Sequence, residues 1–178
     1  MRGSIMKNWS KLIKLVYLII FISLVIISYK GGIDFDIIAE NQFNIITVNT
    51  VFAGFLFTSL GIVAGFSDNA SIRKFERINT MDNIYNNILK GIIFSIISII
   101  IGLIIVVINF EYIIKNVFIY NILKATGYIF ELFSLIITII YFCLSVKHTF
   151  FAISVVRLEI KSKLPNQEKI QKIIEKIK

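Results

Sequence analysis

Four long apolar segments constrain the fold of this chain more than any other feature of its sequence. They lie at about residues 12–28, 44–66, 88–109 and 125–146. Each is close to the roughly 20 residues that a helix needs to cross the hydrocarbon core of a bilayer. They are too long for membrane strands and lack the alternation of apolar and polar residues that such strands show. The sequence therefore predicts an all-α membrane protein with four transmembrane helices.

The overall composition points the same way and excludes several functions. Hydrophobic residues make up 57% of the 178 residues, above the roughly 45–50% of soluble domains. One Cys and one His provide neither an intramolecular disulfide nor a Cys/His zinc site. We find no phosphate-binding loop, no paired catalytic carboxylates and no Ser/His/Asp order, so we expect no enzyme, no cofactor and no metal. The net charge is +8. The charged residues flank the apolar segments, which argues against a direct nucleic-acid partner.

The distribution of Lys and Arg predicts the orientation. Most of them lie before the first span, between the second and third spans, and after the fourth. Only Lys30, Lys115 and Lys124 lie in the other two connections. Because positive residues favour the cytoplasmic side, we expect both termini in the cytoplasm and an even number of membrane crossings. Residues 1–5 resemble an expression-vector leader and are left out of this reasoning.

Stripes of small and hydroxyl residues run along three of the four spans. In the second span the stripe covers about 80° of arc and consists of Thr47, Thr50, Gly54, Thr58, Gly61 and Gly65. In the third it consists of Gly91, Ser95, Ser98, Gly102 and Asn109. In the fourth it consists of Gly127, Glu131, Ser134, Thr138, Ser145 and Ala152.

Small residues let helix backbones approach closely in lipid. We therefore expect spans two, three and four to pack together through these stripes, with the first span at the edge facing lipid. The alternative is that one stripe lines a homo-oligomer interface or a pore.

Glu131 is the one acidic residue within the core of a predicted span. It lies about 9 Å past the start of the fourth span at 1.5 Å per residue. A carboxylate at this depth is unfavourable by a few kcal/mol unless it is paired, protonated or hydrated. Thr47, Thr50 and Asn109 are the donors expected to reach it. Two interpretations stay open: a structural hydrogen bond or a shallow acid reaching the interface, and a cation-attracting vestibule in an oligomer.

Two amphipathic stretches follow the predicted inner ends of the spans. The loop after the second span alternates apolar and basic residues, which predicts a short helix on the membrane or on a partner: Ile72, Arg73, Lys74, Phe75 and Arg77. Residues 157–178 form a basic tail. Its last helix presents one apolar face made of Ile170, Ile173, Ile174 and Ile177. Both stretches are expected to contact anionic lipid or a cytoplasmic protein.

The second span and the polar loop that follows it also carry a resemblance. The run FAGFLFTSLGIVAGF, from Phe52 to Phe66, together with the four-span plan, resembles small membrane proteins of bacterial defence islands, most of all the membrane component of the Kiwa phage-defence system. The resemblance implies a homo-oligomer in the inner membrane, a tetramer, that senses infection and engages a cytoplasmic effector. It carries over no site residue.

Three functions follow as hypotheses. The leading one is a non-enzymatic, oligomeric component of an antiphage system that couples a membrane event to a cytoplasmic partner. The second is a pore-forming effector that depolarises the cell. The third is a multi-span immunity protein against a membrane-targeting toxin.

Overall fold

The computed structural model describes residues 2–66, 72, 80–108 and 110–163. In this part of the chain all regular structure is helical. The elements in chain order are α1 (Arg2–Tyr29), α2 (Phe35–Glu40), α3 (Gln42–Gly65), α5 (Thr80–Val107), α6 (Phe110–Ile113) and α7 (Val117–Lys163). Four of them, α1, α3, α5 and α7, are long and apolar enough to cross a membrane. The prediction of an all-helical chain with four such helices is confirmed.

The long helices extend beyond the predicted spans. The third begins at Thr80 and the fourth at Val117, eight residues before each predicted start. The start of α7 is fixed locally, because Asn116 Oδ1 accepts hydrogen bonds from the backbone N–H groups of Phe118 and Ile119 at 3.0 and 3.3 Å. Such a cap satisfies donors that have no partner within the helix. From there α7 runs unbroken for 47 residues, past the predicted boundary at residue 157.

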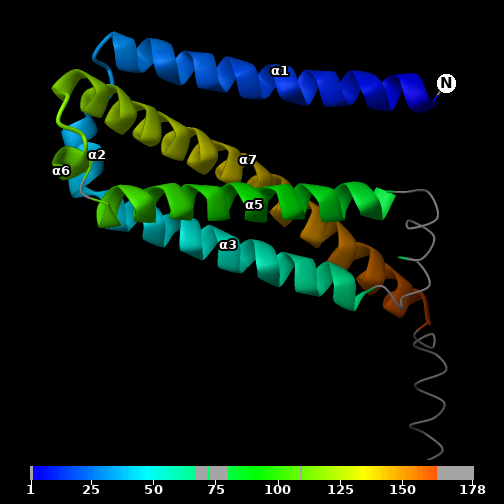
Figure 1. The fold of residues 1–178 in the computed structure, drawn as a ribbon. Helices are drawn as coiled ribbons and strands as arrows, with labels where there is room; N and C mark the ends of the chain where they lie inside the picture. Colours follow the sequence, from blue (N-terminus) through cyan, green and yellow to red (C-terminus); the bar gives the residue numbers. More distant parts are fainter. Residues whose placement is uncertain (1, 67–71, 73–79, 109, 164–178) are drawn as a thin grey trace, which may run out of the picture.

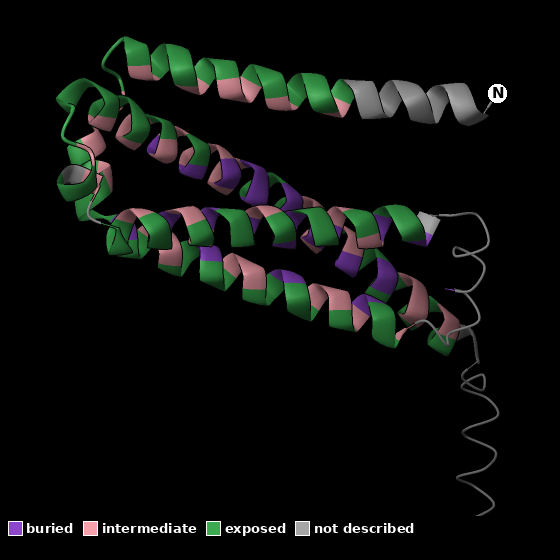
Figure 2. Ribbon diagram, in the orientation of Figure 1, coloured by how far each residue is buried: buried purple, intermediate pink, exposed green. Residues whose placement is uncertain are grey.

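Helices α3, α5 and α7 form the core, and α1 packs on α7 at the edge (Figure 1). Buried residues lie along the facing sides of the three core helices, whereas α1 is exposed or half-buried from Leu12 onward (Figure 2). This arrangement agrees with the expectation for the four spans. The described beginning of α1 and the end of α7 lie at the same end of the bundle (Figure 1).

The edge helix is attached mainly through aromatic rings. Tyr17 meets Phe94 and Phe133 edge-on, with ring centroids 5.7 and 6.3 Å apart, and Phe21 meets Phe130 at 5.2 Å. The Tyr17 hydroxyl also forms a hydrogen bond with the hydroxyl of Tyr141 on α7. Edge-on ring pairs are among the favoured aromatic arrangements.

The core has an apolar half and a polar half. The apolar half lies towards the beginning of α5 and consists of Leu56, Val63, Ile72, Met81, Ile84, Ile88, Ile92 and Ala152. Gly91 allows close packing beside it, since a Cβ there would lie 2.9 Å from Tyr141 Cβ and 3.0 Å from Leu56 Cδ1. The polar half lies towards the other end of the bundle. It holds buried polar side chains that can donate or accept hydrogen bonds.

Candidate functional site

A seam of buried polar side chains runs between α3, α5 and α7. All of its members are at most 3% exposed: Gln42, Asn49, Ser95, Ser98, Glu131, Ser134 and Thr138. The predicted stripes of the third and fourth spans therefore face the interior, where Gly91 and Gly102 are buried as well. Polar groups inside a membrane bundle need partners, because lipid offers no hydrogen bonds.

The centre of this seam is a contact between Glu131 on α7 and Gln42 on α3. Gln42 Nε2 donates to Glu131 Oε1 at 2.6 Å. Gly102 on α5 makes this contact possible: a Cβ at position 102 would lie 2.6 Å from Glu131 Oε1 and 2.9 Å from Gln42 Nε2. No side chain fits there without displacing the pair. One residue from each core helix thus defines the site.

A second linkage lies about two helix turns further along α3 and is centred on Asn49. Asn49 Nδ2 donates to Ser98 Oγ at 2.9 Å, and Ser95 Oγ donates to the Asn49 backbone oxygen at 2.6 Å. Ser98 Oγ in turn donates to the backbone oxygen of Glu131 at 3.3 Å. The stripe on α5 therefore ties α3 to α7 through hydroxyl groups.

Three oxygens of the seam have no hydrogen-bond partner: Gln42 Oε1, Asn49 Oδ1 and Glu131 Oε2. An ionised carboxylate only accepts hydrogen bonds, so it leaves the Gln42 oxygen without a donor. A neutral carboxyl carries one O–H donor, which suits an amide oxygen on the same partner. The chemistry of the pair is that of a buried polar clamp between α3 and α7. Among the described residues there is no group of three or more His, Cys, Asp or Glu that could hold a metal ion.

Two of the three expected partners of Glu131, Thr47 and Thr50, are wrong. Thr47 and Thr50 lie exposed and donate to the Phe43 and Ile46 backbone oxygens of their own helix, at 2.8 and 2.9 Å. Asn109 lies outside the described residues. Glu131 is 0% exposed inside a single chain, which argues against the vestibule interpretation. Sequence reasoning missed Gln42, since it precedes the predicted start of the second span.

The stripe of the second span lies on the outside of the bundle. Thr50, Gly54, Thr58, Gly61 and Gly65 are all exposed, and a Cβ at any of the three glycines would meet nothing within 4 Å. The expectation that this stripe packs within the chain is therefore wrong. We call the face made by Thr47, Thr50, Gly54, Thr58, Gly61 and Gly65 the α3 outer face.

The opposite side of α3 explains this reversal. Its buried residues recur every seventh position: Gln42, Asn49, Leu56 and Val63. At about 100° per residue this row lies on the far side of the helix from the α3 outer face. Two residues of the row carry the amides that bond to α5 and α7. The other two, Leu56 and Val63, carry apolar side chains that fill the apolar half of the core. The helix is oriented by these residues, and its glycines turn outward.

The predicted partner contacts fall into two groups. Ile72, expected on lipid or on a partner, is wrongly assigned, because it is fully buried in the apolar core with Met81 and Ile84. The remaining predicted contacts lie outside the described residues: Arg73, Lys74, Phe75, Arg77, Ile170, Ile173, Ile174 and Ile177.

The class of protein with which four helices of this length and hydropathy are compatible is that of multi-pass membrane proteins. No family model, curated protein or solved structure matches the chain.

Proposed function

We propose that this protein is a non-enzymatic, self-associating component of the bacterial inner membrane that couples a membrane event to a cytoplasmic effector in antiphage defence. The observation that carries the proposal is the α3 outer face. It presents glycines whose surroundings are empty within the chain. A second copy of the same chain is the occupant that we propose for it.

The shape of this face suits a contact between helices. Gly54, Gly61 and Gly65 form a strip of α3 without side chains, and Val51 and Phe57 are exposed on either side of this strip. Small residues at such spacing let two backbones approach closely in lipid, where packing rather than the hydrophobic effect holds helices together. Across a two-fold axis the same face of both copies forms the contact.

The hydroxyl groups of the face favour packing over a water-filled wall. Thr50 and Thr58 donate to the backbone oxygens of Ile46 and Gly54, both at 2.9 Å. Their hydrogens are therefore already bonded within the helix and need no water. This supports a dry contact between copies more than the lining of an ion pathway.

The length of α7 supports coupling across the membrane. Its 47 residues correspond to about 70 Å at 1.5 Å per residue, against about 30 Å for the hydrocarbon core. One continuous helix therefore carries the Glu131 contact at one level and the basic residues Arg157 and Lys161 at another. A tilt of α7 within the bundle would move its basic end, which the charge distribution predicts to be cytoplasmic.

The defence assignment and the tetrameric state come from the resemblance described above, and the effector contact comes from the amphipathic tail. Anionic lipid is the second proposed partner of the tail.

Cysteine cross-linking in membranes tests self-association. In a Cys143→Ser background, which removes the single cysteine, Gly61→Cys places a thiol on the α3 outer face. Ile100→Cys is the matched control, since Ile100 is exposed on α5. We expect a cross-linked dimer with Gly61→Cys and little with Ile100→Cys. Equal yields from both variants, or none from Gly61→Cys, would reject the α3 outer face as the interface.

Removal of residues 165–178 tests the coupling. We expect the shortened protein to assemble as before, to lose its co-purifying cytoplasmic protein and to lose protection in a phage plaque assay. A shortened protein that retains both its partner and its protection would contradict the role of the tail. If plaque formation were the same in hosts with and without the intact protein, the defence role itself would be contradicted.

A further inference from the structure

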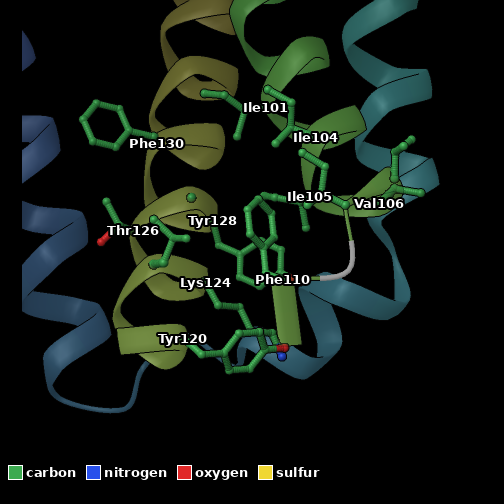
Figure 3. A pocket seen from close by; sticks show the side chains of 14 residues that line it. Ile101, Ile104, Ile105, Val106, Phe110, Tyr120, Lys124, Thr126, Tyr128 and Phe130 are labelled. Carbon is green, nitrogen blue, oxygen red and sulfur yellow. The ribbon is translucent and has the colours of Figure 1, made fainter. Parts of the chain in front are cut away.

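A pocket with a charged end and an apolar wall lies where α5, α6 and α7 meet (Figure 3). It is at the end of the bundle opposite the two described chain ends (Figure 1). Its volume is about 550 Å³, within the roughly 300–1,000 Å³ typical of small-ligand sites. None of its lining residues belongs to the seam around Glu131.

The wall of the pocket is built from two helix faces. Ile101, Ile104 and Ile105 contribute from α5, and Leu123, Gly127 and Phe130 contribute from α7. Both sets recur at helical spacing, so each forms one apolar strip parallel to its helix axis. Gly127 leaves the space between the strips open, since a Cβ there would lie 3.3 Å from Ile105 Cδ1.

The polar groups gather at one end. Figure 3 shows Tyr120 and Lys124 at the end near the start of α7, with Ile101 and Phe130 at the opposite end. Lys124 is the one charged residue among the described residues that line the pocket. From Lys124 to Phe130 the wall extends about 9 Å along α7 at 1.5 Å per residue. The charged end is thus the end nearer the helix termini, and the apolar wall leads towards the middle of the bundle.

The present partners of Lys124 leave its ammonium group available. It lies 3.4 Å from Asp36 Oδ1, whose side chain is 88% exposed, and 6.0 Å from the centre of the Tyr128 ring. An ion pair with so exposed a carboxylate contributes little. A lysine side chain is also long enough to turn towards the membrane surface.

We propose that this pocket binds one anionic phospholipid, with its phosphate on Lys124 and one acyl chain along the strips of α5 and α7. The match of charge and direction carries the assignment: a lipid in a bilayer places its headgroup at the helix ends and its chain towards the centre. A lysine near the membrane surface attracts an anionic headgroup by about 1 kcal/mol. The site is independent of self-association through α3.

Native mass spectrometry of the full-length protein, titrated with phosphatidylglycerol or phosphatidylcholine, tests the proposal. We expect preferential retention of phosphatidylglycerol, and Lys124→Gln should weaken it roughly fivefold, the contribution of one lysine near an anionic lipid. Lys115→Gln is the control, because Lys115 is exposed near the start of α7 and does not line the pocket. The Lys115→Gln variant should retain phosphatidylglycerol as the unmodified protein does.

Filling the pocket tests the acyl-chain contact separately. Gly127→Leu should reduce retention of both lipids, and Ile104→Trp, at a partly exposed wall position, should do the same if Gly127→Leu fails to fold. Equal losses in Lys124→Gln and Lys115→Gln would indicate diffuse surface charge and overturn the site. Unchanged retention in the pocket-filling variants, or equal retention of the two lipids by the unmodified protein, would overturn it too.

Discussion

The stripe on α5 and the stripe on α3 have nearly the same composition and opposite locations. On α5, Ser95, Ser98 and Gly102 are buried and belong to the polar seam or line it. On α3, Gly54, Thr58 and Gly61 are exposed, and the surroundings of the two glycines are open. A stripe of small residues therefore marks a face that another backbone can approach closely, but it does not identify the neighbour. The neighbour is decided by the opposite side of the helix.

The two opposite sides differ in a simple way. On α5 the side facing away from the stripe is aliphatic and exposed, as at Ile93 and Ile100, which suits contact with lipid. On α3 the corresponding side carries Gln42 and Asn49, which have bonding partners on the other core helices. Burying these amides within one chain avoids leaving them unpaired in lipid.

The largest expected effect is at Gly102. Gly102→Leu should lower the free energy of unfolding by about 2–4 kcal/mol, because its side chain displaces the Glu131–Gln42 contact and overfills the core. Gly54→Leu on α3 is the matched control, since its surroundings are open, and it should change stability by about 0.5 kcal/mol or less. Detergent unfolding followed by circular dichroism measures both. Similar losses in the two variants would remove the distinction between the stripes.

The next effect concerns the clamp itself. Glu131→Leu should destabilise the protein by about 1–3 kcal/mol, because it leaves the buried Gln42 amide without a partner. Glu131→Gln should lose much less stability, because the amide can both donate and accept hydrogen bonds. The double variant Gln42→Leu with Glu131→Leu should recover part of the loss, since neither polar group is then left alone. If the double variant lost more stability than the two single variants together, Glu131 and Gln42 would not stabilise the fold as a pair.

The extent to which these features follow from the sequence depends on what a periodic pattern contains. Hydropathy predicts the four helices, and the stripes predict which sides of α5 and α7 face inward, at Ser98 and Glu131 for example. Periodicity gives the faces of a helix but not their phase relative to its neighbours, so the stripe on α3 predicts the wrong face inward. Gln42 was missed because an amide at the edge of an apolar run is usually read as interfacial. The pocket depends on where α5 ends relative to α7, which no local pattern encodes.

A smaller effect is expected at Asn49. Asn49→Leu removes the hydrogen bond to Ser98, and hydrogen bonds between membrane helices contribute about 0.6 kcal/mol on average and at most about 1.7. Asn44→Leu is the control, because Asn44 is exposed on the same helix. Unfolding in mixed detergent micelles compares the two variants. A larger loss at Asn44 would mean that the row of every seventh residue does not orient α3.

The smallest effect on folding, and the most informative for assembly, is at Gly61. Gly61→Leu should leave the unfolding of the monomer within about 0.5 kcal/mol of the unmodified protein, because beyond the local backbone of α3 the new Cβ meets nothing within 4 Å. Association should nevertheless weaken about tenfold, since the added side chain separates the two backbones. Energy transfer between labelled copies in liposomes measures it, with Ile93→Leu on the exposed side of α5 as the control. If Gly61→Leu left association intact, the outward glycines of α3 would face lipid alone. The contrast between the two stripes would then concern folding only and would say nothing about assembly.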